Sequence, residues 1–147
     1  MNPAAALLVV LLAAACGPAK AQGVAPGIYG NVTLNEESGD LGGVELELIG
    51  TGANARIEWV LCEGWCNTIR RAPVQLTPDG FTCSYVEEYV DQDGHPADSK
   101  TFDAVAVRTE AGVTMTITSA DEPQWSFSYD LEPIDKRFGL DVASGKA

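Results

Sequence analysis

Hydrophobic and polar residues alternate with a period of two along most of the chain, which is the pattern of half-buried β-strands. The first alternating segment spans residues 28–34, where Ile28, Gly30, Val32 and Leu34 would share the inward face of a strand. The same pattern predicts further strands at residues 44–48, 56–62, 74–77, 81–85, 102–108, 113–118 and 125–131. Eight strands are therefore expected.

The predicted strands are separated by short turn-forming clusters rich in glycine, proline and acidic residues. These clusters lie at residues 35–40, 78–80, 110–112 and 121–123, and a longer polar connection is expected at residues 87–100. Helical periodicity is confined to one possible turn at residues 134–138, and the tail 143–147 should fray.

Short links of this kind join antiparallel neighbours. An open meander would leave two strand edges unpaired, and closure into a barrel removes them. The expected fold is an all-β, eight-stranded antiparallel up-and-down barrel in a single domain at residues 22–142. A two-sheet β-sandwich is the alternative, with the 87–100 connection crossing between the sheets.

The first residues have the features of an export signal. An apolar run at residues 4–15 precedes Ala19-Lys20-Ala21, a small-x-small cleavage site, so residues 1–21 are expected to form a signal peptide cut before Gln22. The apolar run is too short to span a bilayer. Cys16 offers an alternative, because the residues before it loosely resemble a lipobox and would anchor the protein as a lipoprotein. We favour a soluble periplasmic or secreted protein.

The expected mature chain is strongly acidic. Without residues 1–21, which carry only Lys20, 8 Lys and Arg face 21 Asp and Glu, a net charge of −13. Repulsion excludes nucleic acid as a natural partner. The charge supports solubility and would attract a basic protein, a cation or a cationic ligand.

The stretch from Gly27 to Leu46 carries a Tyr-x-Asn-Val strand, a Glu-Glu-x-Gly-Asp turn and an apolar-acidic strand. With Cys62-Glu63-Gly64 further on, it resembles a group of small secreted proteobacterial proteins of no known activity. This resemblance ends near Pro73, implies kinship and brings no catalytic residue with it. By architecture alone, the expected barrel is similar to lipocalin-like proteins and to small inhibitors of secreted proteases or lysozymes.

Aromatic residues dominate the faces expected to point inward. They would line a pocket for an apolar ligand or simply fill the core, since eight strands enclose a lumen that side chains can fill. These candidate ligand-binding residues are Trp59, Phe81, Tyr85, Trp125, Phe127 and Tyr129. Trp65 lies outside any alternating run and is a candidate contact for a protein partner.

No set of residues indicates catalysis or a bound metal. His95, the only histidine, lies in a flexible acidic turn rather than beside a nucleophile. Asp91, Asp93 and Asp98 lack the spacing of a calcium loop. Carboxylates such as Glu45 and Glu47 are explained by strand alternation. Zinc would need three cysteines to converge with a histidine on a separate loop. We expect no catalytic residue, metal or cofactor.

Cys62 and Cys66 flank Glu63-Gly64-Trp65, and Cys83 completes an odd set of three mature cysteines. Cys-x-x-x-Cys in an all-β context does not fit a thioredoxin-like site. Alternation turns Cys83 into the core and Cys62 away from it, which disfavours a bridge between them. A Cys62–Cys66 disulfide would staple the bend at Gly64 and hold Trp65 outward, leaving Cys83 as a buried thiol. A Cys66–Cys83 disulfide is the alternative.

The sequence thus predicts a non-catalytic exported binding protein that carries an apolar small ligand in a barrel lumen. The alternative is a protein-interaction or enzyme-inhibitor module that binds a basic exported protein through its loops and Trp65.

Overall fold

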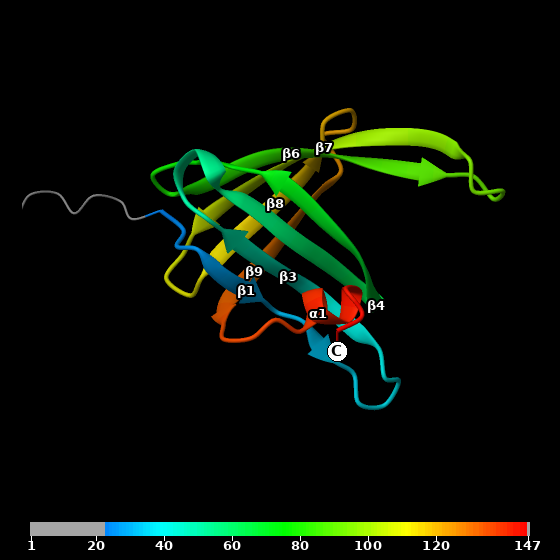
Figure 1. Ribbon diagram of the computed structural model, residues 1–147, viewed down its shortest axis with the longest axis horizontal. Helices are drawn as coiled ribbons and strands as arrows, with labels where there is room; N and C mark the ends of the chain where they lie inside the picture. The colour runs from blue at the N-terminus through cyan, green and yellow to red at the C-terminus, as the bar shows by residue number, and fades with distance from the viewer. Residues whose placement is uncertain (1–22, 147) are drawn as a thin grey trace, which may run out of the picture.

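The computed structural model describes residues 23–146 (Figure 1). The expected signal peptide, the lipidation candidate Cys16 and the last residue lie outside this range. The strands are β1 (Gly27–Gly30), β2 (Thr33–Leu34), β3 (Leu41–Ile49), β4 (Arg56–Pro73), β5 (Gln75–Leu76), β6 (Gly80–Val90), β7 (Pro96–Arg108), β8 (Val113–Ser119) and β9 (Ser126–Ile134). A 3-10 turn, η1 (Gly52–Asn54), and one short helix, α1 (Gly139–Ala143), complete the fold.

All strand pairs are antiparallel and form one curled sheet. Its order is β2-β3-β1-β9-β8-β7-β6-β5, and β4 pairs with the other edge of β3. The first and last strands, β1 and β9, pair with each other, so the sheet curls into a nearly closed barrel. The predicted all-β barrel is confirmed and the alternative sandwich is not, but residues 23–146 form nine strands rather than eight.

The count differs because the expected strand 28–34 is interrupted. Gly30 pairs with Glu45 and Thr33 pairs with Gly42, so β1 and β2 keep one register along β3. Asn31 and Val32 lie between them and leave the strand geometry. The alternation of apolar and polar residues runs through both β1 and β2 and gives no sign of the break at Asn31 and Val32.

β4 is more than twice as long as expected because it turns back on itself (Figure 1). The Cα atoms of Cys62 and Cys66 are 4.2 Å apart, and Gly64 between them has a φ of 79°. Further down, the N–H of Val74 donates to the carbonyl of Ala55 at 3.0 Å. The two halves of β4 therefore lie side by side, and the second half faces β6 across the seam of the barrel.

The prediction of a polar connection at residues 87–100 is wrong. β6 and β7 continue through it as a hairpin that projects beyond the barrel, at the upper right of Figure 1, and only residues 91–95 form the turn. This extension has solvent on both faces. Its side chains therefore do not alternate between apolar and polar, and the sequence pattern of a half-buried strand is missing.

The inward side chains form one continuous buried cluster that runs through the barrel. Val44, Leu46 and Leu48 point inward as predicted, as do Val113, Met115 and Ile117. The predicted face of the first strand is wrong, since Tyr29 is buried and Ile28 is only half-buried. The Tyr29 hydroxyl donates to the carbonyl of Ala25 at 2.8 Å, which allows this polar tip to be buried.

The helix begins after the expected turn at 134–138, and α1 packs on the outside of β3 and β4. Leu140 is buried there in a second apolar cluster with Leu41, Val60, Cys62 and Cys66. Beyond it, the backbone N–H groups of Ser144, Gly145 and Lys146 bond to carbonyls of the helix. The tail expected to fray is thus hydrogen-bonded as far as Lys146.

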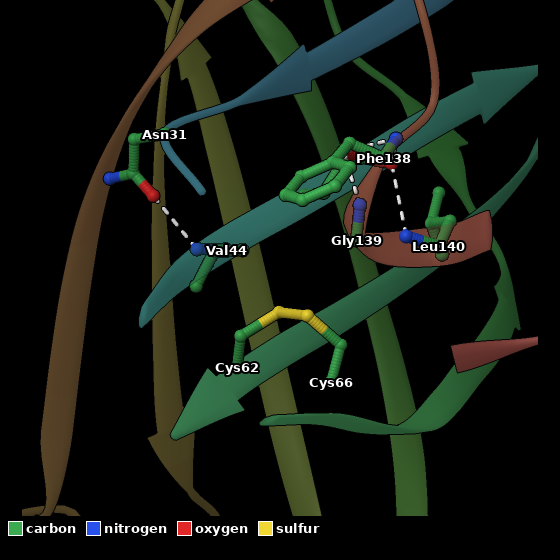
Figure 2. The surroundings of a disulfide bond; sticks show 8 residues. Asn31, Val44, Cys62, Cys66, Phe138, Gly139 and Leu140 are labelled. Atoms are coloured by element: carbon green, nitrogen blue, oxygen red, sulfur yellow. Dashed lines mark hydrogen bonds between the residues drawn. A yellow bond between two sulfur atoms is a disulfide. The ribbon is translucent and has the colours of Figure 1, made fainter. Parts of the chain in front are cut away.

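Glu45 shows why α1 lies at this place. It points outward as the alternation predicts, yet it is fully buried, because α1 covers it. Its carboxylate accepts N–H bonds from Phe138, Gly139 and Leu140 at 2.9 to 3.1 Å (Figure 2). These are the N–H groups that a helix start leaves without partners. Strand alternation alone therefore does not explain Glu45.

Candidate binding surface at the open end of the barrel

The two ends of the barrel differ. At one end, on the right of Figure 1, β2 and β9 diverge and the sheet splits. β9 pairs with β8 from Ser126 to Leu131, but with β1 only from Glu132 to Ile134. Within residues 23–146, no strand pairs with the other edge of β9 from Ser126 to Leu131. We call this end the mouth.

Asn31 marks the point where the split begins. Its side-chain Nδ2 donates to the carbonyl of Asp130 in β9 at 3.0 Å. Its Oδ1 accepts the N–H of Val44 in β3 at 2.7 Å (Figure 2), and its own N–H donates to the carbonyl of Val44 at 2.9 Å. One side chain thus bridges the two strands at the level where β1 leaves the sheet.

Gly43 makes room for this bridge. Its φ is +118°, and a Cβ at this position would lie 2.6 Å from the carbonyl oxygen of Asn31 and 2.7 Å from Oδ1. Only glycine fits this conformation and this contact without strain. Neither Asn31 nor Gly43 was predicted from the sequence. An asparagine inside an alternating strand, and a Gly-Gly pair at the start of the next strand, are the signals that could have indicated them.

Aromatic side chains lead from the core to the mouth. The Trp59 and Tyr85 rings meet edge-on at 5.5 Å, and Tyr85 stacks on Phe102 at 5.5 Å. On β9, Phe127 pairs with buried Ile117, which places it on the same inward face. Yet Phe127 is 49% exposed and Trp125 is 57% exposed, because the barrel is open there.

Of the six aromatic residues predicted to line a pocket, the structure buries Trp59, Phe81 and Tyr85 and half-buries Tyr129. Trp125 and Phe127 are exposed at the mouth rather than enclosed. Alternation gave the face of Phe127 correctly but did not show where the barrel wall ends.

Polar groups accompany these rings. The Arg70 guanidinium lies 4.6 Å from the centre of the Trp59 ring and forms an ion pair with Glu87, which joins the second half of β4 to β6. The Nε1 of Trp59 is buried without a hydrogen-bond partner in the described chain. Sequence reasoning missed Arg70, which lies in a part of β4 that it left unassigned.

The hydroxyl groups near the mouth stay protonated well above neutral pH. Burial raises the pKa of Tyr85, and the Glu87 carboxylate raises it further. Burial also raises the pKa of Tyr129, with a further contribution from the Glu63 carboxylate. Glu63 therefore contributes negative charge near Tyr129. At the outer rim, Lys100 and Glu122 form an exposed ion pair with 3.0 Å between Nζ and Oε2.

A hollow of about 650 Å³ lies beside the split. Residues 30–33 line one side of it, and residues 130–132 line another. The β7–β8 turn, residues 109–111, lines the third side. The charged residues in its lining are Glu110, Asp130 and Glu132, all exposed and all acidic. A positively charged group would be favoured in this hollow.

The disulfide Cys62–Cys66 is formed, and Cys83 is a buried free thiol. Both predictions are confirmed. α1 covers this disulfide, and a Cβ added at Gly139 would lie 3.3 Å from the Cys62 Sγ (Figure 2). Trp65 projects from the stapled bend and is 51% exposed. Burial raises the pKa of the Cys83 thiol to about 11, and the Asp103 carboxylate adds to the shift.

Asp91, Asp93 and His95 gather on the exposed β6–β7 turn, with potential ligand atoms within 4.8 Å of one another. One Asp91 carboxylate oxygen accepts the backbone N–H groups of Asp93 and His95 at 2.9 Å, as turn-forming aspartates do. Asp98 lies outside this group, opposite Tyr89 in the ladder.

A cleft of about 760 Å³ lies at the other end of the barrel. The segment Gly23–Pro26 lines it together with the turns before β6 and β8. Tyr29, Leu48 and Val113 contribute apolar surface there.

Comparison with family models, with curated proteins and with solved structures finds no match for this chain. The resemblance to small secreted proteobacterial proteins therefore stays a prediction. Among residues 23–146, no helix is long and apolar enough to cross a membrane.

Proposed function

We propose that this protein is a non-catalytic binding protein that engages a partner protein through the mouth of its barrel. The observation that carries the proposal is the pair of half-exposed aromatic residues, Trp125 and Phe127, beside a stretch of β9 whose second edge pairs with no strand of residues 23–146. Exposed aromatic side chains supply much of the binding energy in protein interfaces. A neighbouring strand edge supplies directional hydrogen bonds.

The charge of the chain narrows the class of partner. Residues 23–146 carry 8 Lys and Arg against 21 Asp and Glu, which is −13. This charge repels a second copy of the chain as well as polyanions, and it attracts a basic protein. A periplasmic or secreted location is part of the proposal, supported by the disulfide and by the expected signal peptide, since disulfides persist in oxidising compartments.

Quantitative capture from an exported protein fraction tests the proposal. Immobilised wild-type protein should retain one or more basic proteins that the Trp125→Ala, Phe127→Ala double variant loses. Val105→Ala is the matched control, since Val105 is a similarly exposed apolar residue outside the mouth, on the outward face of β7. Equal retention by all three proteins would refute a binding role for the mouth.

Trp65 needs its own variant because it lies on a different surface, the stapled bend. Trp65→Ala would reduce capture if the bend belongs to the interface. This result is expected if the protein is an inhibitor that binds an enzyme through its loops. Unchanged capture would limit the interface to Trp125, Phe127 and the edge of β9.

A carrier of small apolar ligands is the second candidate. The ring contacts from Trp59 through Tyr85 to Phe102, and the exposed Phe127, favour an apolar group that enters at the mouth. Because the inward side chains form a continuous buried cluster, such a ligand fits better at the mouth than at the centre of the barrel. Native mass spectrometry of protein isolated from its source should then detect a bound small molecule that Phe127→Ala fails to retain.

A further inference from the structure

We propose that the partner binds by strand addition: an extended segment that alternates apolar and basic residues pairs antiparallel with β9 along Ser126–Tyr129. This inference rests on the proposed function and specifies how the mouth recognises its partner. It starts from a contact beside the open edge of β9, the bond from Asn31 Nδ2 to the Asp130 carbonyl.

That contact identifies which backbone groups face the open edge. In an antiparallel strand, the N–H and C=O of one residue point to the same side, and those of the residue two positions away point there too. The carbonyl of Asp130 points away from β8, so the N–H and C=O groups of Ser126 and Ser128 do as well. Those of Phe127 and Tyr129 point toward β8, consistent with their pairing to Ile117 and Met115.

Nothing in residues 23–146 covers these groups as a strand would. β2 keeps the register of β1 along β3 but does not pair with β9. The Asp130 carbonyl already accepts the Asn31 Nδ2, so the free stretch ends at Tyr129. It is about 10 Å long at 3.3 Å per residue, which matches an added strand of about four residues. An exposed strand edge attracts other strands, and natural barrels usually leave no such edge. An open edge flanked by exposed aromatic residues therefore indicates a docking site.

The two faces of β9 determine the side chains of the added strand. Phe127 and Tyr129 lie on the inward face, so the partner should place apolar residues beside them. Ser126, Ser128 and Asp130 lie on the outward face, where Asp130 also accepts a bond from the Thr114 hydroxyl at 2.6 Å. The acidic hollow lined by Glu110, Asp130 and Glu132 adjoins this face, so the outward residues of the partner should be basic.

A second copy of the chain fits this surface poorly. Pairing two β9 edges would bring together two molecules of charge −13 and two copies of the acidic hollow. The complementary occupant is a basic segment of another protein.

The first test uses defined peptides and the full mature protein. The probe is an acetylated and amidated seven-residue peptide that alternates valine with lysine, and its control alternates valine with glutamate. Isothermal titration calorimetry at low salt should give at least tenfold tighter binding of the lysine peptide. Similar affinities for both peptides would overturn the charge complementarity.

N-methylated peptides separate strand addition from simple charge attraction. In the proposed pairing, lysine residues lie opposite Ser126 and Ser128, and their N–H groups face β9. Methylation of the lysine N–H groups should therefore reduce affinity tenfold or more, whereas methylation of the valine N–H groups should leave it unchanged. Equal effects of the two modifications would refute strand addition.

Ser128→Pro provides the matching change in the protein. Proline removes an N–H that faces the open edge and is tolerated on edge strands, so the fold should survive while peptide binding is lost. Wild-type affinity in a folded variant would contradict the proposal, and a variant that does not fold leaves the decision to the N-methylated peptides. Sedimentation that shows a wild-type dimer broken by Ser128→Pro would identify a second copy as the occupant and overturn the proposal.

The outcomes separate this inference from the proposed function. If the peptides fail but capture still depends on Trp125 and Phe127, strand addition is wrong and the mouth remains a binding surface. If capture is also independent of these residues, the proposed function itself fails.

Discussion

Asn31 and Gly43 together determine where the wall of the barrel opens. The Asn31 side chain takes over the hydrogen bonds that a continuing strand would make to Val44 and Asp130. The backbone can approach Gly43 this closely only because that residue has no Cβ. Beyond this pair β2 follows β3, and no other strand in the described part of the chain pairs with this edge of β9.

Gly43→Ala should lower the free energy of unfolding by about 2 kcal/mol or more, because it adds a methyl group in a strained left-handed conformation and against the Asn31 oxygens. Gly42→Ala is the matched control, since a Cβ there meets nothing within 4 Å and φ is not positive. Its effect should stay within about 0.5 kcal/mol. Denaturant unfolding of both variants measures the difference, and equal losses would contradict the role given to Gly43.

Because of the buried Cys83 thiol, the free energy of unfolding should decrease at alkaline pH. Its pKa is about 11 in the folded protein against an ordinary value of 9.0. Because the pKa is raised, this contribution to stability is complete below pH 9 and decreases as the pH rises toward 11. The loss at pH 10.5 should be about 2 kcal/mol. Chemical denaturation at pH 8 and pH 10.5 should show this extra loss in the wild type and not in Cys83→Ala, whereas parallel losses would be evidence against it.

The direction in which a side chain points could be predicted where it depends only on which face of the strand is buried. The disulfide and the buried thiol followed from the faces of Cys62 and Cys83. The face of Tyr29 did not, because a tyrosine suits either side and its bond to Ala25 is a tertiary contact. The bridge made by Asn31 was also out of reach, since it joins strands 99 residues apart in the chain.

The alternation of apolar and polar residues located the strands that have one buried face. It failed for the projecting part of the β6–β7 hairpin, where neither face is buried. It also failed for α1, which has five residues and is too short to show a helical period. The position of α1 depends on Glu45, a carboxylate 94 residues from Gly139 in the chain.

Glu45→Gln should release α1 from the barrel. A glutamine offers one acceptor oxygen where the carboxylate offers two, so some N–H groups of residues 138–140 lose their partner and face an amide instead. The free energy of unfolding should fall by about 2 to 3 kcal/mol, as for a buried charged hydrogen-bond network. Amide hydrogen exchange should be faster at residues 138–140.

The disulfide provides an independent readout of the same movement, because α1 covers Cys62 and Cys66. Reduction by a water-soluble phosphine should be faster in Glu45→Gln than in the wild type. Glu88→Gln, at an exposed outward position of β6, is the control and should leave the rate unchanged. A rate that is the same in all three proteins would mean that α1 does not protect the bond.

The barrel as a whole combines a packed centre with two different ends. Composition and alternation predicted the closed architecture and the acidic surface. They did not predict which end would be open, because that depends on where β1 leaves β9 and on how far β6 and β7 extend past the other strands. The mouth is therefore a property of the assembled barrel rather than of any one strand.

Hydrogen exchange along β9 tests this account of the mouth in the free protein. The amides of Phe127 and Tyr129 point toward β8 and should be protected, whereas those of Ser126 and Ser128 point to the open edge and should exchange quickly. Nearer the other end, Glu132 and Ile134 pair with β1, so their amides should be protected again. Uniform protection from residue 126 to 134 would show that the edge is covered, whereas an alternation confined to 126–129 would show an open edge from Ser126 to Tyr129.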